Sequence, residues 1–371
     1  MAGPVVAIIG AGVVGAAVAF RLAAGGAQVH LVDAGQPGGG TSSASFAWVN
    51  GNQKTPRDYF DLNVAGLREH LRLRDELGAA PWLHPGGNLV WATDPVATDE
   101  LAQRVRRLQA WGYAAEWRSA AQVTAELEPG IAFPRPDLSV AYFPDEFWVD
   151  APLLVTRLVA LAQERGAVVR AGTPAEAIET TQGRISAVRL ADGSRLAVDA
   201  VVNASGAAAD RVAGLLGLPL PLAPTTGLLV RVAVEGAPLR RIMHAPGVNL
   251  RPDGPGHVLL HSETIDPLLG ERRTIAPDDP LCRELLQRAR RVLPALAGAR
   301  VVAARVGVRP IPADGRSCFG AVSAVPRYYE AVTHSGVTLS LLVGRLLARE
   351  LLAGEVEPLA APFRPDRFPR T

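Results

Sequence analysis

The sequence predicts an α/β fold of two interleaved domains, one built on a parallel sheet and one on a mainly antiparallel sheet. Short apolar strands alternate with helical segments in three separate parts of the 371-residue chain, a pattern typical of parallel sheets. Two strand-rich or mixed insertions separate these parts. We therefore expect the first domain at residues 1–80, 150–220 and 300–371, and the second at residues 81–149 and 221–299.

The chain opens with a predicted strand, helix and strand. Val5–Ile9 is a short apolar run rich in β-branched residues, as expected of a buried parallel strand. Ala16–Ala24 reads as a helix that ends at Gly25 and Gly26. Gln28–Val32 forms the second strand. This order is the first half of a βαβ unit.

Three glycines, Gly10, Gly12 and Gly15, follow the first strand with the spacing G-x-G-x-x-G. The first allows a tight turn, the second lets a pyrophosphate approach the backbone, and the third lets helix and strand pack closely. The helix then presents free N–H groups to the phosphates. Asp33 stands where a carboxylate would bind a ribose diol, which argues against NADP. The sequence thus predicts a Rossmann-type dinucleotide-binding domain.

Further elements follow from hydrophobic period and turn residues. Between the opening unit and residue 149 we expect a helix over Arg57–Leu77, a strand over Gly86–Trp91, helices over Asp99–Trp111 and Ala120–Glu128, and a proline-rich loop over Pro129–Pro144. The next segment holds a helix over Asp150–Arg165, a strand over Gly166–Arg170, a hairpin over Gly183–Val198 that turns at Asp192-Gly193, and a strand over Ala200–Asn203. The remainder predicts strands over Gly227–Val234, Val248–Arg251, His257–His261, Ala299–Arg309 and Tyr328–Val332, with helices over Pro280–Leu293 and from about Ser335 to Leu352.

Composition narrows the function classes. The net charge of +2 gives no reason to expect nucleic acid or an anionic membrane as a partner. Cys282 and Cys318 are too few for a disulfide framework or a structural zinc site, so we expect two free thiols and no metal. The sequence shows neither a signal peptide nor an apolar run of membrane-spanning length. We therefore expect a cytoplasmic protein.

Six motifs spread over nearly the whole chain carry a family resemblance. They are IIGAGVVGAAVA, GGGTSSASFAWVN, AYFPDEFWVDAPLL, VVNASGAAAD, GVRPIPADGRSCFG and AVTHSGVTLSLLVGRLLARELL. Together they resemble the D-amino-acid oxidase superfamily of flavoproteins, in its glycine oxidase and sarcosine oxidase branch. The resemblance implies FAD as cofactor and an amine or amino-acid oxidoreductase. Such an enzyme oxidises a C–N bond by hydride transfer to flavin N5, gives an imine, and passes the electrons to oxygen to form hydrogen peroxide.

The resemblance also assigns cofactor-binding residues. Those expected to hold the diphosphate, the adenosine and the ribityl chain are Gly10, Gly12, Val13, Val14, Gly15, Asp33, Ala34, Thr41, Ser42, Ser43, Val169, Ala204, Ser205 and Gly206. Those expected around the flavin ring are Ala47, Trp48, Gly307, Arg309, Ser335, Gly336, Val337 and Thr338. A helix beginning at the last four would aim its positive dipole end at the flavin and stabilise negative charge that develops on reduction. An ordinary helix start after a glycine turn is the alternative.

On the substrate side, Arg309 of Gly307-Val308-Arg309-Pro310 matches the arginine that clamps a substrate carboxylate in glycine-oxidase-like members. A guanidinium can bind both carboxylate oxygens, although an arginine at a strand end can equally form a structural ion pair. Asn249 stands where the family often has a tyrosine. His261 and His334 are candidates for the pocket wall, with a purely structural role as the alternative.

Besides Asn249, the sequence departs from the family pattern in three further respects. Gly307 stands where sarcosine oxidases carry the cysteine that binds FAD covalently, so we expect non-covalent FAD. A tryptophan frequent in the family is replaced by Ala208. Sarcosine oxidases also use a lysine near the flavin for the reaction with oxygen, and the single lysine here, Lys54, lies in a different segment. Whether Lys54 reaches the pocket stays open at this point.

Two alternative functions stay open. One is a dehydrogenase that passes electrons to a quinone or to another protein instead of oxygen. The other is a flavin-dependent tailoring oxidase or desaturase that acts on a biosynthetic intermediate. Trp48, Phe147 and Trp148 would suit the second, because large aromatic side chains could line a pocket roomier than a small amino acid needs.

Overall fold

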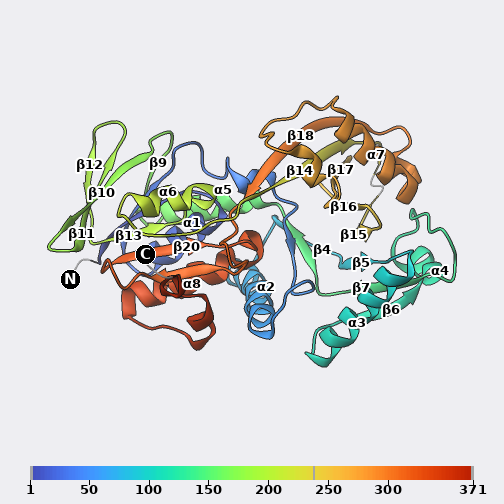
Figure 1. The fold of residues 1–371 in the computed structure, drawn as a ribbon, viewed down its shortest axis with the longest axis horizontal. Helices are drawn as coiled ribbons and strands as arrows, with labels where there is room; N and C mark the ends of the chain where they lie inside the picture. Colours follow the sequence, from blue (N-terminus) through green and yellow to red (C-terminus); the bar gives the residue numbers. More distant parts are fainter. Residues whose placement is uncertain (1–2, 237–238, 369–371) are drawn as a thin grey trace.

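The computed structural model describes residues 3–236 and 239–368, which form two lobes around separate sheets. One lobe, on the left of Figure 1, holds a six-stranded sheet with strands from the beginning, middle and end of the chain; we call it the cofactor lobe after the role expected from the sequence. The other, on the right, holds an eight-stranded sheet, and we call it the substrate lobe on the same basis. Both sheets are accompanied by helices, so the predicted α/β fold with a Rossmann-type unit and a mainly antiparallel sheet is confirmed.

The six-stranded sheet has the order β19-β20-β13-β1-β2-β9. All neighbours pair in parallel except β19 with β20. The strands are β1 (Val5–Ile9), β2 (Gln28–Val32), β9 (Val168–Arg170), β13 (Ala200–Asn203), β19 (Cys318–Ala321) and β20 (Tyr328–Val332). Their apolar runs fit a sheet that is covered on both faces.

Helices cover one face of this sheet and a small sheet covers the other. α1 (Val13–Ala24) packs between α5 (Ala151–Gln163) and α8 (Gly336–Ala353) over the face that carries Val6 and Ile8. On the opposite face, Ala7 and Ile9 share a core with residues of the three-stranded sheet β10 (Ala175–Thr181), β11 (Arg184–Leu190) and β12 (Arg195–Ala197). The predicted hairpin turns at Gly193, whose φ of +82° only glycine adopts readily.

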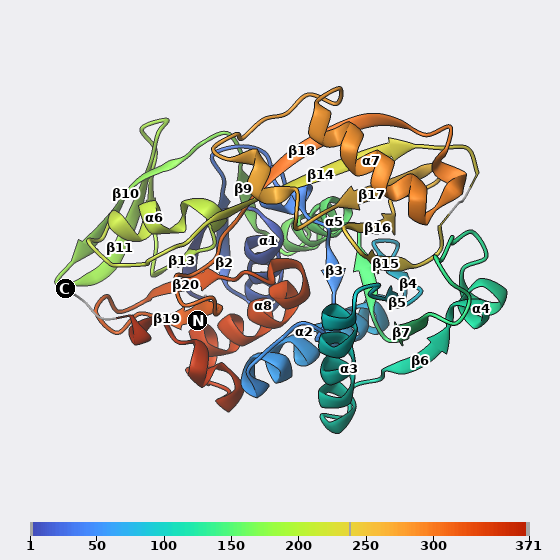
Figure 2. The same ribbon diagram turned by 45° about the vertical axis from the view of Figure 1, so that its right-hand side comes forward.

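The eight-stranded sheet has the order β18-β14-β17-β16-β15-β5-β7-β6 and is antiparallel except between β15 and β5. Its strands are β5 (Asn88–Val90), β6 (Glu116–Ser119), β7 (Ser139–Phe143), β14 (Thr225–Ala233), β15 (Ile242–Ala245), β16 (Val248–Pro252), β17 (His257–His261) and β18 (Arg300–Arg309). β18 lies in a segment expected for the first domain, yet it pairs along its length with β14. Figure 2 shows these two long strands crossing from the substrate lobe to the cofactor lobe.

Successive side chains along β14 alternate between the two faces of this sheet, and this alternation shows which face is covered by a helix. Leu228, Val230 and Val232 are buried against α7 (Pro280–Val292), which covers the outer face. Gly227, Leu229 and Arg231 therefore lie on the other face. The same alternation places His261 of β17 and Asn249 of β16 on that inner face, next to Leu229 in register.

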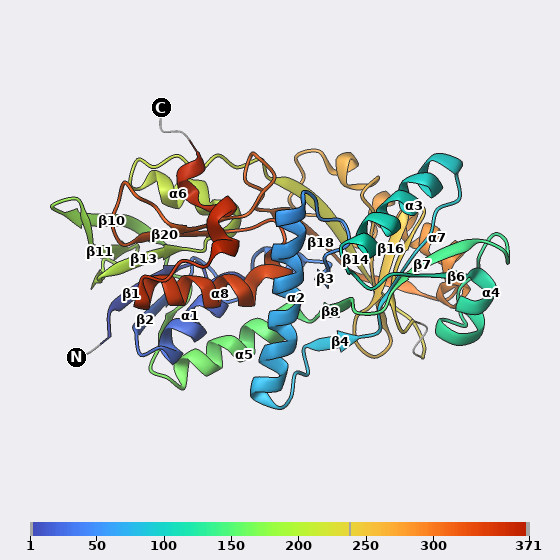
Figure 3. The ribbon, with the colours of Figure 1, turned by 90° about the horizontal axis from the view of Figure 1, so that it is seen from below.

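Smaller elements connect the lobes. The segment over 41–44 is a 3₁₀ turn, and β3 (Trp48–Val49), β4 (Leu83–Pro85) and β8 (Phe147–Val149) form a three-stranded sheet. α2 (Arg57–Leu77), whose bounds match the prediction, stands between the lobes in Figure 3 and packs against α8. The remaining helices are α3 (Pro95–Ala110), α4 (Ala120–Gln122), which continues as a π-helical turn over Val123–Leu127, and α6 (Ala209–Gly214). Within the described ranges, no helix is long and apolar enough to cross a membrane.

One expectation about secondary structure is wrong, and several short strands have no predicted counterpart. Residues 129–144 are not a continuous loop, because Ser139–Phe143 forms β7 between β5 and β6. The prolines that flank this short strand obscure its apolar pattern. A further strand, β15 at Ile242–Ala245, has no counterpart among the predicted elements. A run of four residues is too short to reveal its period.

Candidate functional site

One cavity of about 390 Å³ lies between the two lobes. Its walls come from three places: the beginning of α1 with the loop over 41–54, the beginning of α8, and the inner face of the eight-stranded sheet. The first two belong to the part expected to bind the cofactor, and the third to the part expected to bind the substrate. The cavity thus joins the two sets of predicted residues.

The glycine turn before α1 is closely packed. Gly10 has φ +107°, and a Cβ there would overlap the carbonyl oxygen of Ala204. A Cβ at Gly15 would overlap the carbonyl oxygen of Gly10. The first intrahelical bond is donated by Ala16 N to Gly12 O at 2.9 Å, and Val13 N donates to Ser42 Oγ at 3.0 Å. The N–H groups of Val14 and Gly15 therefore have no acceptor within the helix and are available to a ligand. This is the geometry that a pyrophosphate needs.

Asp33 is held at the end of β2 by two backbone donors. Its carboxylate accepts hydrogen bonds from Ala11 N at 2.6 Å and from Gly35 N at 2.7 Å. Because an ionised carboxylate can accept about four hydrogen bonds, two positions remain for a ribose diol. Val169 lies beside it on β9, which pairs with β2. The carboxyl ends of these two strands therefore suit an adenosine.

The beginning of α8 is fixed by α2. The first backbone bond runs from Leu339 N to Ser335 O at 2.9 Å, which leaves the N–H groups of the first turn available. His70 of α2 lies 2.8 Å from Val337 O, and burial lowers the pKa of its imidazole to about 4. A neutral ring that faces a carbonyl must donate from that nitrogen. Tyr59 adds a contact of 3.1 Å between its hydroxyl and the Ser335 hydroxyl.

The inner face of the large sheet presents a row of side chains to the cavity. His261 of β17, Asn249 of β16 and His244 of β15 are register partners on successive strands. Register partners point to the same face of a sheet. All three line the cavity, and each is less than 10 % exposed. We call these three residues the polar row.

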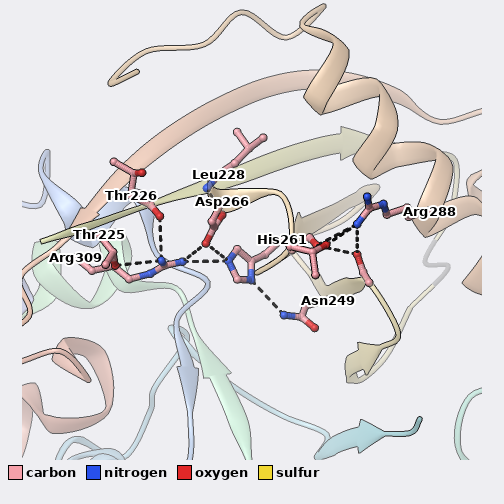
Figure 4. A network of polar contacts seen from close by, with 11 residues as sticks. Thr225, Thr226, Leu228, Asn249, His261, Asp266, Arg288 and Arg309 are labelled. Carbon is pink, nitrogen blue, oxygen red and sulfur yellow. Dashed lines mark hydrogen bonds and ion pairs between the residues drawn. The ribbon is translucent and has the colours of Figure 1, made fainter. Parts of the chain in front are cut away.

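Arg309 joins this row at the end of β18. Its guanidinium Nη2 lies 2.7 Å from Asp266 Oδ2 and 3.1 Å from His261 Nε2, while Nη1 donates to Thr226 O at 3.1 Å (Figure 4). His261 Nε2 also lies 3.0 Å from Asp266 Oδ2. The predicted clamp is thus already part of a network inside the protein.

The tautomer of His261 follows from its neighbours. Asp266 only accepts when ionised, so His261 Nε2 carries the proton that faces it. In the neutral ring Nδ1 is then the acceptor for Asn249 Nδ2, at 3.2 Å. The contact between Arg309 and His261 Nε2 is therefore not a hydrogen bond. Because Nη1 also donates to Thr225 Oγ1 at 3.4 Å, one Nη2 N–H and the Nε–H of Arg309 remain for a ligand. Burial raises the pKa of Asp266, but the bonds from His261 and Arg309 bring it below its usual range.

Two glycines make room for this arrangement. A Cβ at Gly227 of β14 would overlap the guanidinium of Arg309, which crosses it. A Cβ at Gly307 of β18 would overlap the carbonyl oxygen of Ala44. Glycine at these positions lets the large sheet approach the loop over 41–44 and lets the arginine lie flat across its neighbour strand.

Three further ionisable side chains line the cavity, those of Lys54, His334 and Glu263. Burial lowers the pKa of Lys54 to about 8, and the charge of Glu146 acts in the opposite direction. Burial lowers the pKa of His334 to about 4, and the positive charges of Lys54 and Arg309 add to this shift. At neutral pH the cavity wall therefore carries two cations, Lys54 and Arg309, and a neutral His334, together with the carboxyl side chain of Glu263.

The cavity brings together most of the predicted site residues. Those that line it are Gly12, Val13, Val14, Thr41, Ser42, Ala47, Trp48, Ala204, Gly206, Asn249, His261, Gly307, Arg309, His334, Ser335, Gly336, Val337 and Thr338. Those that do not line it are Gly10, Gly15, Asp33, Ala34, Ser43, Val169 and Ser205. Most of the second group lie in the glycine turn or at the carboxyl ends of β2, β9 and β13, where the diphosphate and adenosine are expected.

Other expectations about the site need correction. Phe147 and Trp148 do not line the cavity; Trp148 stacks on His84 with ring centroids 3.8 Å apart. The sequence left open whether Lys54 reaches the pocket, and the structure places it in the cavity wall. His244 and Asn50 also line it and are absent from the sequence predictions. His244 lies on the unpredicted strand β15, so no sequence signal placed it next to Asn249.

The remaining described features agree with these assignments. Both cysteines are buried and free, as expected, and neither lines the cavity, in keeping with non-covalent FAD. The glycine turn that a Cβ would fill, the free N–H groups at two helix starts and the carboxylate of Asp33 are the groups that a flavin adenine dinucleotide requires. The residues present therefore fit FAD.

Comparison with known proteins gives the same picture. The family model described as "FAD dependent oxidoreductase" matches residues 6–350. Glycine oxidase of Geobacillus kaustophilus is 29 % identical over 367 residues, which cover 96 % of this chain and 95 % of that protein. Glycine oxidase of Pseudomonas putida is 29 % identical over 374 residues, with 97 % and 98 % covered. The crystal structure of the Geobacillus kaustophilus glycine oxidase superposes with a TM-score of 0.87 at 26 % identity, covering 99 % of this chain and 100 % of that one.

Proposed function

The chain belongs to the family of FAD-dependent oxidoreductases, among those that act on amines and amino acids, and we propose that it oxidises the C–N bond of a small amine that carries a carboxylate. The product would be an imine, which water hydrolyses, and the electrons would pass to oxygen to give hydrogen peroxide. The observation that carries this proposal is the shared cavity. The starts of α1 and α8, which suit the cofactor, and Arg309, which suits a carboxylate, line the same space.

The residues that would hold FAD are those described above. The N–H groups at the start of α1 would bind the diphosphate, and Asp33 the adenosine ribose. When bound, FAD supplies the acceptor for a hydride from the substrate carbon. The start of α8 would lie at the flavin ring, where its free N–H groups stabilise developing negative charge.

Arg309 would orient the substrate. Its two uncommitted N–H groups can bind carboxylate oxygens, and this fixes the reacting carbon relative to the cofactor. Removal of the substrate amine from water disfavours its charged form. The amine therefore loses its ammonium proton more readily in this cavity than in water, as hydride transfer requires.

Lys54 supports oxygen as the electron acceptor. Reduction of oxygen develops negative charge, which a buried cation beside the reaction site stabilises. With the pKa of Lys54 at about 8, the side chain is largely cationic at neutral pH. The same cavity would also serve a dehydrogenase, so the acceptor is the first quantity to measure.

The test is an anaerobic one. The purified protein with bound FAD is mixed without oxygen with glycine, sarcosine, a panel of D-amino acids and imino acids, and bleaching of the oxidised flavin absorbance is followed. Air is then admitted. Bleaching by a carboxylate-bearing amine followed by rapid recovery with hydrogen peroxide formation is the expected result. Bleaching without recovery in air would make the protein a dehydrogenase.

Arg309→Ala separates a substrate role from a structural one. We expect the rate of anaerobic bleaching at low substrate to fall by at least 100-fold while FAD remains bound. A matched control is Arg300→Ala at the other end of the same strand, where the exposed side chain does not line the cavity. A loss of FAD from Arg309→Ala that equals its loss of rate, or no loss of rate in this variant, would contradict the proposed role.

A further inference from the structure

A buried polar network lies behind the cavity wall at the end of the polar row. Glu146 accepts hydrogen bonds from Trp48 Nε1 at 2.8 Å, Asn88 Nδ2 at 2.9 Å and the Tyr113 hydroxyl at 2.9 Å. Tyr113 in turn accepts from Gly51 N at 2.9 Å, so its own proton must face Glu146. Because all three groups donate to it, the carboxylate fixes the orientation of the Asn88 amide.

That orientation determines the tautomer of His244. Asn88 uses Nδ2 for Glu146, so its Oδ1 faces His244 Nδ1 at 2.8 Å. A carbonyl oxygen only accepts, and Nδ1 therefore carries the proton. His244 Nε2 is then a bare acceptor. It has no hydrogen-bond partner within the described part of the chain, and its ring lines the cavity.

Asn50 provides a second, independent acceptor on the same wall. Its side chain is 3 % exposed and lines the cavity, and its Nδ2 donates to Trp48 O at 3.2 Å. Its Oδ1 has no hydrogen-bond partner among the described residues. Leaving a buried acceptor unpaired destabilises a protein unless a ligand or water satisfies it. The buried Asn50 Oδ1 and the bare Nε2 of His244, which lines the same cavity, therefore point together to a ligand that donates.

The separation between Arg309 and His244 indicates where on the ligand the donor group lies. His261, which contacts the guanidinium, and His244 are separated by one strand, β16. Two strand spacings of about 4.8 Å place their backbones roughly 10 Å apart. The primary carboxylate and the group at His244 thus belong to different parts of the substrate, with a few bonds between them.

We infer that His244 Nε2 and Asn50 Oδ1 bind a hydroxyl, amide or amine N–H on a substituent that extends from the reacting carbon or nitrogen toward β15. This inference rests on the proposed function and specifies its substrate class as a carboxylate-bearing amine with a distal hydrogen-bond donor. Burial keeps His244 neutral by lowering its pKa to about 3, with Arg104 and His261 adding to the shift. His244 is accordingly a positioning residue that accepts a hydrogen bond, and the proton stays with the ligand.

The test compares matched substrates that differ in one polar group. The pairs are N-(2-hydroxyethyl)glycine with N-propylglycine, and racemic homoserine with racemic norvaline. For the FAD-bound wild type we expect the donor-bearing member to have a kcat/KM about 3- to 10-fold higher in at least one pair, the range that one hydrogen bond supplies. If a compound of a pair binds without being oxidised, its dissociation constant can be measured from the change that it causes in the flavin spectrum. The dissociation constants of the two compounds are then compared in place of kcat/KM.

His244→Phe removes the acceptor and keeps an aromatic ring against Trp48, whose ring centroid lies 4.1 Å away. The preference ratio should fall to about one in His244→Phe and in Asn50→Leu, and Asn50→Asp, which retains an acceptor, should restore part of it. His257→Phe, at the outer end of β17 and outside the cavity, is the matched control and should keep the wild-type ratio.

The outcomes separate this inference from the proposed function. Oxidation of both members with no preference in the wild type would overturn the inference and leave the proposed function intact. A preference that persists in His244→Phe and Asn50→Leu would also overturn it. If neither pair, nor any member of the simple amine panel, reduces the flavin or changes its spectrum, the proposed function fails and the inference fails with it.

Discussion

The guanidinium of Arg309 lies 2.7 Å from the carboxylate of Asp266, so the cation proposed for the substrate carboxylate already has an anionic partner. The Asp266 carboxylate also accepts from Leu228 N at 2.8 Å and from His261. Because Asp266 is tied to the β14 backbone, it sets where the guanidinium lies. It also reduces the net charge that a substrate carboxylate meets, and these two effects act in opposite directions on substrate binding.

We predict that the second effect is larger. Asp266→Asn keeps an oxygen for Leu228 N and replaces Oδ2, which accepts from Arg309 and His261, by an amide NH2 that cannot accept. The guanidinium is then released to the substrate, and KM for a carboxylate-bearing amine should decrease about 10-fold, the lower end of the range for a charge-assisted hydrogen bond. Steady-state kinetics at constant oxygen measure it. Asp253→Asn, which alters the partner of Arg231 and Arg251 outside the cavity, is the control. An increase in KM would mean that Asp266 mainly positions the arginine.

The space for Arg309 depends on Gly227. A Cβ at this position would overlap the guanidinium, so Gly227→Ala should displace it from the position beside His261. A shift of about 1 Å in a group that orients the substrate lowers the rate of the chemical step roughly 100-fold. We expect that loss in kcat/KM with an unchanged ratio of flavin to protein. Gly214→Ala, in open space at the end of α6, should have no effect on either quantity. Retained kcat/KM in Gly227→Ala would show that Arg309 does not orient the substrate.

Features of the structure can be predicted from the sequence when the residues that determine them lie close together in the chain. The βαβ unit at the N-terminus, α2, and the strands at Ala200–Asn203 and Tyr328–Val332 match the structure because their apolar runs, glycines and caps lie within a few residues. The resemblance extends this to the start of α8 and to Arg309, since both lie inside recognisable motifs. These features account for most of the cavity wall.

What the sequence does not reveal depends on contacts between distant strands. His244 reaches the cavity because β15 pairs with β16 on one side and with β5, from a much earlier part of the chain, on the other. Asp266 contacts Arg309 only because a loop after β17 folds onto β14. Neither pairing leaves a period in the sequence, so Arg309 can be recognised as a candidate clamp while its anionic partner cannot.

Lys54 makes substrate binding depend on pH. Its pKa is lowered to about 8 by burial, so the cavity loses one of its two positive charges as the pH rises through 8, while Arg309 stays charged. We predict that KM for a carboxylate-bearing amine rises between pH 7 and 9 in the wild type. Lys54→Met should show no such change and should resemble the wild type at pH 9 throughout. A pH profile shared by both proteins would contradict this assignment.

Glu146 makes stability depend on pH as well. Burial raises the pKa of its carboxyl from 4.5 to about 7, although hydrogen bonds from Asn88, Tyr113 and Trp48 oppose the shift. Between these two values the folded protein holds a proton that the unfolded chain has released. The free energy of unfolding therefore contains a contribution that falls as the pH rises from about 4.5 to 7, by at most about 1.4 kcal/mol per pH unit.

Glu146→Gln removes this titration, so its free energy of unfolding should lack the decrease expected for the wild type. Relative to the wild type, the variant should therefore gain stability as the pH rises from 5 to 7. From pH 7.5 to 8.5 the difference between the two proteins should stay constant. Urea unfolding of the FAD-bound proteins at each pH measures it. Glu330, buried in the cofactor lobe with a pKa raised to about 8, offers a comparison. Glu330→Gln should show the same trend, extended to pH 8. If the difference in unfolding free energy between Glu146→Gln and the wild type does not change from pH 5 to 7, the three donors keep Glu146 ionised over this range. The hydrogen bond by which Glu146 orients the Asn88 amide would then be independent of pH.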